Sequence, residues 1–309
     1  MLWLWILLGV IGFIIILFFL ALYAVFRGTF YTPIKGQNED MVFTPATEKY
    51  ADMDVVKGMV ANCLAMPYED TYVTSFDNKK LKARVYRNQK SDTVCIMCHG
   101  YRGTPCRDFS GGAVDMVNSG YNVILISERG HYGSEGHSIT FGVREKEDCK
   151  SWINYARKEF GEDKRIVLIG ISMGGATVLM ASDYLKEGDR VIADCPYTTP
   201  KEIISNSIKS LLHMNPKIMW PVANLTSIIF GHTNLAKEDA CEHVKNSKAK
   251  IMIIHGEDDT LVPYQFSKRA QDLCPDKVRY ELFPKAEHGI SYIVDKERYQ
   301  RVVNEFLKK

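Results

Sequence analysis

The sequence has almost no net charge. Its 39 Lys and Arg residues nearly balance 37 Asp and Glu residues, so the formal charge is +2 over 309 residues. Nucleic-acid-binding domains usually carry a clear excess of clustered positive charge, and this balance argues against a nucleic-acid partner. With 46% apolar residues and only eight cysteines, the composition also excludes a disordered chain and a small disulfide-bonded scaffold.

The N-terminus lacks charge altogether. No Lys or Arg precedes the uncharged run from Leu2 to Phe26, whereas a secretory signal peptide has a basic start and an apolar region of only 7–15 residues. As a helix the run would be roughly 37 Å long, enough to cross a hydrocarbon core of roughly 30 Å with some tilt. We therefore predict an uncleaved transmembrane anchor at residues 1–27, with residues 2–26 contacting the lipid bilayer.

The charges that follow the run give its orientation. Arg27 and Lys35 come after it, so the positive-inside rule places the bulk of this single-pass protein in the cytoplasm. Scattered or strand-embedded cysteines agree, because reduced buried thiols are typical of that compartment. The alternative is a cleaved signal peptide, for which Ala21-Leu22-Tyr23-Ala24 offers a weak cleavage site.

Beyond the anchor, the pattern indicates a linker and then one folded domain. Residues 28–47 are polar and contain Pro and Gly, which predicts a juxtamembrane linker. We place the folded domain at residues 48–309. Thr71 to Phe76 and Leu81 to Arg87 alternate apolar and polar residues, which is typical of an antiparallel hairpin.

The rest of the domain alternates buried strands with helices, an α/β pattern. Short apolar runs indicate strands buried on both faces of a parallel sheet; they are Thr93 to Cys98, Asn122 to Ile126, Arg165 to Ile171, Arg190 to Ala193 and Lys250 to Ile254. Glu145 to Phe160 and Gly174 to Lys186 have helical spacing. The segment 198–246 is too long for an ordinary connection and is predicted to be an inserted helical cap.

One serine lies where a buried strand must turn into a helix. Gly170-Ile171-Ser172-Met173-Gly174 follows the strand that begins at Arg165. A serine on such a strained turn needs small residues two places on either side, because side chains there would clash with neighbouring backbone. Ser172 is therefore a candidate nucleophile; the alternative for an arbitrary serine in this position is a helix N-cap.

A serine hydroxyl becomes nucleophilic only when a base takes its proton, so a histidine and an orienting carboxylate should follow Ser172 in the chain. Histidine and carboxylate residues follow two later strands. His255-Gly256-Glu257-Asp258-Asp259 follows the Lys250 strand, and Ala286-Glu287-His288-Gly289 follows an expected strand at Tyr280 to Phe283.

In these motifs and their order the sequence resembles the α/β-hydrolase superfamily, specifically its capped serine hydrolases of the esterase, lipase and serine-aminopeptidase type. The resemblance implies the α/β-hydrolase fold: a mostly parallel central sheet flanked by helices, with an inserted helical cap and here one N-terminal transmembrane helix. It assigns the acid to Asp259, with Asp258 as the neighbouring alternative, and the general base to His288. Asp194, where a minority of the superfamily has its acid, is interpreted as a structural turn.

The resemblance also predicts an oxyanion hole. One donor is the backbone N–H after the nucleophile, that of Met173, and the other comes from a His-Gly-x loop, here the N–H of Tyr101. Glu128 to Ser134 resembles another superfamily turn and is interpreted as structural. Five other histidines are treated as ordinary surface or core residues; they are His131, His137, His213, His232 and His243.

Cys95-Ile96-Met97-Cys98-His99 has the spelling of a haem-attachment or redox motif. On a strand, however, Cys95 and Cys98 would point to opposite faces and could not hold one group. Since no other Cys and His grouping has zinc spacing, we predict no cofactor and no metal.

The function predicted is that of a serine hydrolase that cleaves a carboxylic ester, thioester or amide through an acyl-Ser172 intermediate. Its substrate would be a small-molecule or lipid-like acyl compound. A serine peptidase and a membrane-lipid hydrolase are the alternatives within this class. A catalytically inactive, membrane-tethered binding protein on a hydrolase fold is the alternative from another class. The oligomeric state stays open.

Overall fold

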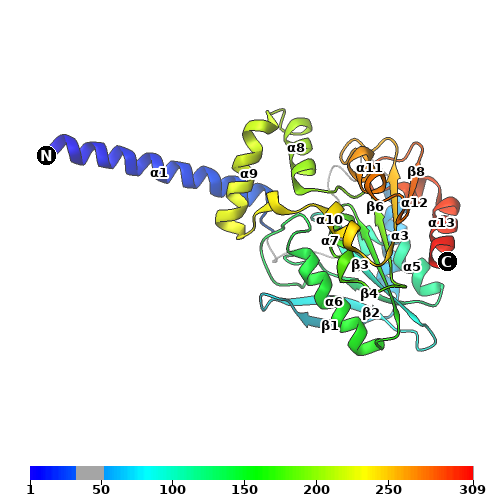
Figure 1. Ribbon diagram of the computed structural model, residues 1–309. Helices are drawn as coiled ribbons and strands as arrows, with labels where there is room; N and C mark the ends of the chain where they lie inside the picture. Colours follow the sequence, from blue (N-terminus) through cyan, green and yellow to red (C-terminus); the bar gives the residue numbers. More distant parts are fainter. Residues whose placement is uncertain (33–51, 309) are drawn as a thin grey trace.

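The computed structural model describes residues 1–32 and 52–308 and is built around one eight-stranded sheet (Figure 1). The strand order is β1-β2-β4-β3-β5-β6-β7-β8. The strands are β1 (Glu69–Thr74), β2 (Lys80–Tyr86), β3 (Thr93–Cys98), β4 (Asn122–Ile126), β5 (Arg165–Ile171), β6 (Arg190–Asp194), β7 (Lys250–Gly256) and β8 (Val278–Phe283). β1 and β2 pair antiparallel, β2 also pairs antiparallel with β4, and all later pairs are parallel. The predicted hairpin and mostly parallel sheet are confirmed.

Helices cover both faces of this sheet. One face packs against α6 (Glu145–Phe160), α7 (Met173–Met180) and α10 (Ala240–Asn246). The other packs against α3 (Met53–Ala65), α4 (Pro105–Asp108), α5 (Gly112–Asn118) and α13 (Lys296–Lys308). Around the sheet lie the remaining short elements, η1 (Ser182–Tyr184), η2 (Leu235–Lys237), α11 (Tyr264–Leu273) and α12 (Ser291–Val294). Because both faces are covered, the central strands are buried throughout, as their continuous apolar sequences indicate.

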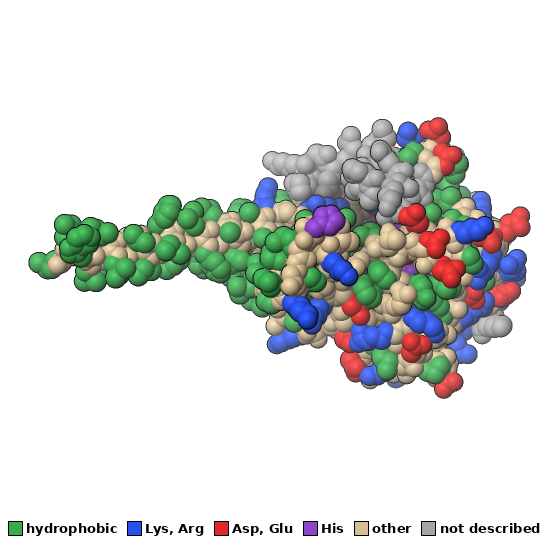
Figure 2. Space-filling model, turned by 90° about the horizontal axis from the view of Figure 1, so that it is seen from above, with side chains coloured by type: hydrophobic (Ala, Val, Ile, Leu, Met, Phe, Trp, Pro, Cys, Tyr) green, Lys and Arg blue, Asp and Glu red, His purple; other side chains and the backbone are tan. Residues whose placement is uncertain are grey.

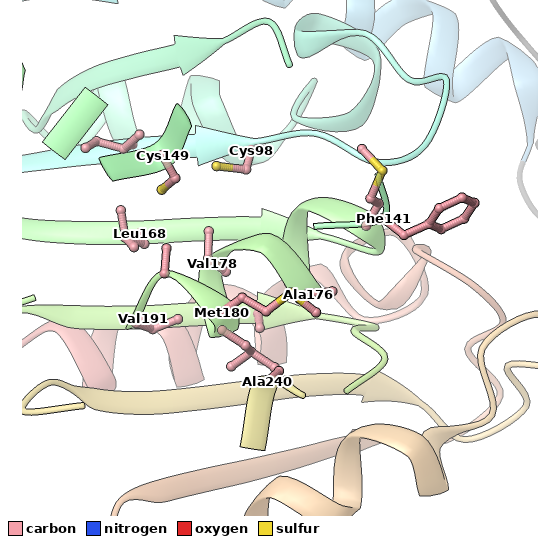
Figure 3. Close-up of a cluster of buried hydrophobic side chains, with 14 of the residues drawn as sticks. Cys98, Phe141, Cys149, Leu168, Ala176, Val178, Met180, Val191 and Ala240 are labelled. Carbon is pink, nitrogen blue, oxygen red and sulfur yellow. The ribbon is translucent and has the colours of Figure 1, made fainter. Parts of the chain in front are cut away.

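The two cysteines of the Cys-x-x-Cys motif lie on opposite faces of β3. Cys98 faces Cys149 of α6 in the cluster drawn in Figure 3, whereas Cys95 belongs to the cluster on the other face. The alternation of side chains along a strand accounts for this separation. The prediction that Cys95 and Cys98 point to opposite faces of the strand is thus confirmed.

The N-terminal helix α1 (Leu2–Thr29) projects from the globular part as an apolar rod, and charged side chains gather on the globule instead (Figure 2). It is long and apolar enough to cross a membrane. Its last two turns are different, because Leu22, Phe26 and Phe30 are buried in the domain. The backbone then continues along the domain edge, where Ile139 donates its N–H to the Phe30 carbonyl at 2.7 Å.

The first residues of the predicted linker belong to this docked segment. Residues 28–32 lie against the domain, where Thr32 donates its N–H to the His137 carbonyl, and residues 33–47 lie outside the described residues. The expected start of the domain at residue 48 also lies outside them. The first described element after the gap is α3, whose N-cap is Asp52.

The inserted segment 198–246 divides into two parts. α8 (Pro200–Ser210) and α9 (Pro216–Gly231) pack on each other and stand beside the sheet, and α9 also packs on α1 (Figure 1). α10 instead packs on α7 and α11, within the layer that covers the sheet. The cap helices therefore occupy residues 200–231. The expected helix 174–186 is also shorter, because α7 ends at Met180 and η1 follows it.

Candidate active site

Ser172 sits at the sharp turn between β5 and α7. Its backbone has φ 55° and ψ −114°, a conformation that L-residues rarely adopt. The turn requires the two flanking glycines, because a Cβ on Gly170 would collide with the Gly174 carbonyl, and one on Gly174 with the Cys98 carbonyl. The strained turn presents the Ser172 hydroxyl at the carboxyl edge of the sheet, which is the nucleophile elbow that the motif predicts.

The three side chains expected to act together do meet. His288 Nε2 lies 2.9 Å from Ser172 Oγ, and His288 Nδ1 lies 2.7 Å from Asp259 Oδ2. They come from three separate loops, after β5, β7 and β8, whose carboxyl ends lie at one edge of the sheet. Asp258 is exposed to solvent, so its carboxylate is not the one that the fold brings to His288.

Asp259 is held by its own loop. Its Oδ1 accepts hydrogen bonds from the backbone N–H groups of Leu261 at 3.0 Å and Val262 at 2.8 Å. Burial by itself would raise the pKa of this carboxyl, but His288 and His255 outweigh burial and hold the pKa well below its usual range. Asp259 is therefore a fixed anion that can stabilise a positively charged His288.

Asp194 has a different environment. Its Oδ2 accepts a hydrogen bond from the Tyr299 hydroxyl at 3.0 Å, and its backbone carbonyl accepts one from Ser172 N–H. Complete burial raises the pKa of its carboxyl to about 7, against the opposing effect of Tyr299. The residue thus supports the turn at Ser172, in keeping with the structural interpretation made from its sequence.

The loop after β3 lies directly beside the serine, since a Cβ on Gly100 would be 3.5 Å from Ser172 Cβ. Asp108 Oδ2 accepts the Gly100 N–H at 2.7 Å, and His131 Nε2 accepts the Arg102 N–H at 3.1 Å. Between these two fixed amides, the N–H of Tyr101 donates to no acceptor within the described residues, and neither does that of Met173. Both remain available for an oxyanion.

The same loop is also tied to helix α1. The Tyr101 hydroxyl donates to the Thr29 carbonyl at 2.8 Å, and Arg102 Nη2 donates to the carbonyls of Gly28 at 2.9 Å and Tyr31 at 3.2 Å. These carbonyls belong to the end of α1, where backbone acceptors lack partners within the helix. The apolar helix and the candidate oxyanion loop therefore form one hydrogen-bonded unit.

Sequence reasoning missed several supporting residues. His131 accepts the Arg102 N–H, Asp108 accepts the Gly100 N–H, and His255 contacts Asp259, a role that the motif containing both residues does not reveal. His255 lies between Asp259 and Ser267, with its Nδ1 at 2.7 Å from Ser267 Oγ. No local pattern links His131 to Arg102, because they lie 29 positions apart in the chain.

One cluster of potential metal ligands among the described residues coincides with the triad; it is Cys195, Asp259 and His288. Burial, with the nearby Asp194 and Asp259, raises the pKa of the Cys195 thiol well above its usual range, so the free thiol stays protonated. Both ring nitrogens of His288 are already engaged. The cluster therefore fits proton transfer better than metal binding.

Comparisons with known proteins agree with this architecture. Residues 63–204, less than half of the chain, match the family model of X-Pro dipeptidyl-peptidases of the S15 family. The solved structure of the Pyrococcus furiosus esterase Pf2001 is similar, with a TM-score of 0.66 and 22% identity over 91% of this chain and 98% of that one. The fold, the site and the partial family match together support a serine hydrolase of the α/β-hydrolase fold.

Two curated relatives share only low sequence identity with this chain. The uncharacterized protein YqkD of Bacillus subtilis is 23% identical over 69% of this chain and 70% of its own length. The lysophosphatidylserine lipase ABHD12 of Danio rerio is 26% identical over 60% of this chain and 48% of its own length. Such identities support the shared fold and leave the substrate to be argued from the site.

Two buried histidines, His99 in the loop after β3 and His131 in the turn after β4, predict a pH effect on stability. Burial lowers the pKa of His99 to about 4 and that of His131 to about 3, from 6.5 in the unfolded chain. Both stay neutral in the fold, so the unfolded chain binds protons first, and their contribution is lost as the pH falls from 6.5 toward 3. By pH 5 the loss is about 2 kcal/mol for each histidine.

Replacing His131 by Gln, whose side-chain oxygen can also accept the Arg102 N–H, should remove that titration. We expect the stability difference between wild type and His131→Gln to shrink by about 2 kcal/mol between pH 7.5 and pH 5. Denaturant unfolding of the two proteins side by side at both pH values measures it, and opposing groups such as Asp194 cancel in the difference. A difference that is the same at both pH values would contradict a buried neutral His131.

Proposed function

We propose that the protein hydrolyses carboxylic esters, with Ser172 as nucleophile, His288 as general base and acid, and Asp259 as the carboxylate that orients His288. The observation that carries the proposal is the continuous chain of short contacts from Ser172 Oγ through His288 to Asp259. An inactive binding protein would have no need to keep these groups aligned together with two free amides.

The reaction would proceed in two halves. His288 Nε2 takes the proton of Ser172 as its Oγ attacks the ester carbonyl, and the charged imidazole is stabilised by Asp259. The N–H groups of Tyr101 and Met173 stabilise the tetrahedral oxyanion. His288 then gives its proton to the departing alcohol. Water, activated by His288, attacks the acyl-Ser172 and restores the free serine.

Two observations favour a membrane location for this reaction. α1 is long and apolar enough to span a bilayer, and its last turns are built into the domain through Phe26 and Phe30 and the loop hydrogen bonds. Cleavage of α1 as a signal peptide would remove or expose these contacts, so the proposal keeps it as a single-pass anchor. The positive charge of Arg27 and Lys35 after the anchor favours a cytoplasmic domain.

The acyl substrate is proposed to be a small or lipid-like ester. Membrane-lipid hydrolysis is the second candidate, favoured by the anchor, by the apolar cap helices and by the similarity to a lysophosphatidylserine lipase. Peptide hydrolysis is the third, favoured by the partial match to the S15 family.

A substrate panel separates these functions. We expect purified full-length protein to hydrolyse p-nitrophenyl acetate and butyrate, and not an X-Pro p-nitroanilide, because p-nitrophenolate is a much better leaving group than the p-nitroaniline nitrogen. The rates are measured by nitrophenol or nitroaniline release, with the Ser172→Ala protein as the background control. Release from the anilide without release from the esters would contradict esterase function and favour the peptidase.

A further inference from the structure

Cap helix α9 carries its apolar side chains on the outside. Ile218, Leu225 and Ile228 are exposed, with 66%, 39% and 40% of their surface accessible, and Pro221 lies on the same stripe. The spacing of three or four residues places them along one face of the helix. An isolated water-soluble domain would normally present polar residues there.

Two hydroxyl side chains of the same helix point inward. Thr226 and Ser227 are almost completely buried, and their hydroxyls find no hydrogen-bond partner within the described residues. Unlike an ordinary surface helix, α9 therefore exposes large apolar side chains while two of its hydroxyl side chains are buried. At the turn that precedes α9, Leu211 and Leu212 are also exposed, with 67% and 61% of their surface accessible, so the apolar surface extends beyond the helix itself.

The position of α9 relative to α1 indicates what covers this surface. Residues 2–21 of α1 lie outside the domain, and 20 helical residues span about 30 Å, the thickness of the hydrocarbon core. The membrane boundary therefore falls close to Leu22, the first buried residue of α1. If α1 spans the bilayer, everything that packs on the following turn lies at the membrane surface.

α9 packs on that turn. The Phe230 ring lies 5.5 Å from Tyr23 and 5.6 Å from Phe26, measured between ring centroids. Figure 1 shows α9 running across the end of α1 rather than alongside it. A helix in this position runs along the membrane surface.

We infer that α9 and the turn at Leu211 and Leu212 lie in the interfacial layer of the bilayer that α1 crosses, with the exposed stripe directed into the lipid. This inference rests on the proposed anchor but not on the proposed esterase activity. It gives the domain a second membrane contact besides α1. That contact restricts rotation about α1 and places the cap at the lipid surface.

The lipid-facing helix α9 is also linked through α8 to the loop that holds Asp259. Asn206 of α8 donates its side-chain N–H to the Leu261 carbonyl at 2.9 Å, in the loop whose amides hold Asp259. α8 packs in turn on α9. The lipid-facing helix is therefore separated from the triad loop by a single helix.

Lipid quenching of a fluorophore on α9 tests the inference in the full-length chain. Single cysteines introduced as Ile218→Cys, Leu225→Cys or Ile228→Cys, with Cys274→Ser to remove the most accessible native thiol, are labelled with an environment-sensitive dye. The proteins are reconstituted in phosphatidylcholine and phosphatidylglycerol vesicles that contain brominated lipid. Val294→Cys is the matched control, because Val294 is similarly exposed, at 42%, and lies on α12, away from α1 (Figure 1).

We expect about a twofold loss of fluorescence at the three α9 positions and none at the control. Bromine near the headgroup should quench more than bromine at the chain end, because an interfacial helix is buried only roughly 5–10 Å. α9 labels that resemble the control would overturn the inference. So would labels shielded from water but not quenched, since a protein partner or a second copy would then cover the face. Neither outcome depends on whether the protein hydrolyses esters.

Discussion

Ser172→Ala is expected to lower the rate of ester hydrolysis by about a millionfold in kcat, to the residual level that an oxyanion hole and binding alone provide. The physical reason is that no other hydroxyl lies within hydrogen-bond reach of His288 Nε2 in the described chain. Covalent labelling by a fluorophosphonate probe should disappear together with the activity. Rate and labelling are measured on the same preparations.

The control for this substitution is Ser119→Ala, at an exposed serine after α5. It should label and turn over like wild type. Alanine retains the β-carbon that the strained turn already accommodates, so Ser172→Ala should unfold at nearly the wild-type temperature. Labelling that persists in Ser172→Ala, or that is lost in Ser119→Ala, would overturn the assignment of the nucleophile.

The sequence was most informative where chemistry restricts residue type. Gly170 and Gly174 are required because backbone atoms occupy the space of their side chains, and such a requirement leaves a motif that can be read directly. The buried strands were equally readable, since a strand covered on both faces needs a continuous apolar run. Together they led to the fold and to the three side chains that meet at Ser172.

The end of α1 was not readable in the same way. Arg27 to Thr32 looks like the start of a polar linker, yet Phe30 is almost completely buried and Arg102 binds the carbonyls of this turn. These contacts join residues more than seventy positions apart, and no local pattern announces them. For the same reason, the sequence does not indicate that His131 accepts a hydrogen bond from the Arg102 N–H.

The sequence also could not predict which face of cap helix α9 is buried. Its length and prolines indicated an insertion, but periodicity alone could not show that the apolar stripe of α9 faces outward while Thr226 and Ser227 face inward. An amphipathic pattern gives the two faces of a helix without saying which is buried. That orientation depends on α1, whose placement next to α9 is a tertiary contact.

Asp259→Asn is expected to lower kcat by about ten-thousandfold with a much smaller effect on KM. The cause lies in the loop geometry. Asp259 Oδ1 accepts hydrogen bonds from the amides of Leu261 and Val262, and only an oxygen can do so. In the variant the amide oxygen takes that place, which leaves the NH₂ group directed at His288 Nδ1.

An NH₂ donor forces His288 into the tautomer that carries its proton on Nε2. That proton then faces Ser172, so Nε2 can no longer accept the serine proton.

Two neighbouring carboxylates serve as controls. Asp258→Asn, at an exposed position, should retain wild-type activity. Asp194→Asn should cost less than about tenfold, because a carboxyl with a pKa of about 7 already exists partly in its neutral form and its amide can still accept from Tyr299. Steady-state rates of all three variants at one pH decide the matter: a large loss in Asp194→Asn beside a small one in Asp259→Asn would move the acid of the triad from β7 to β6.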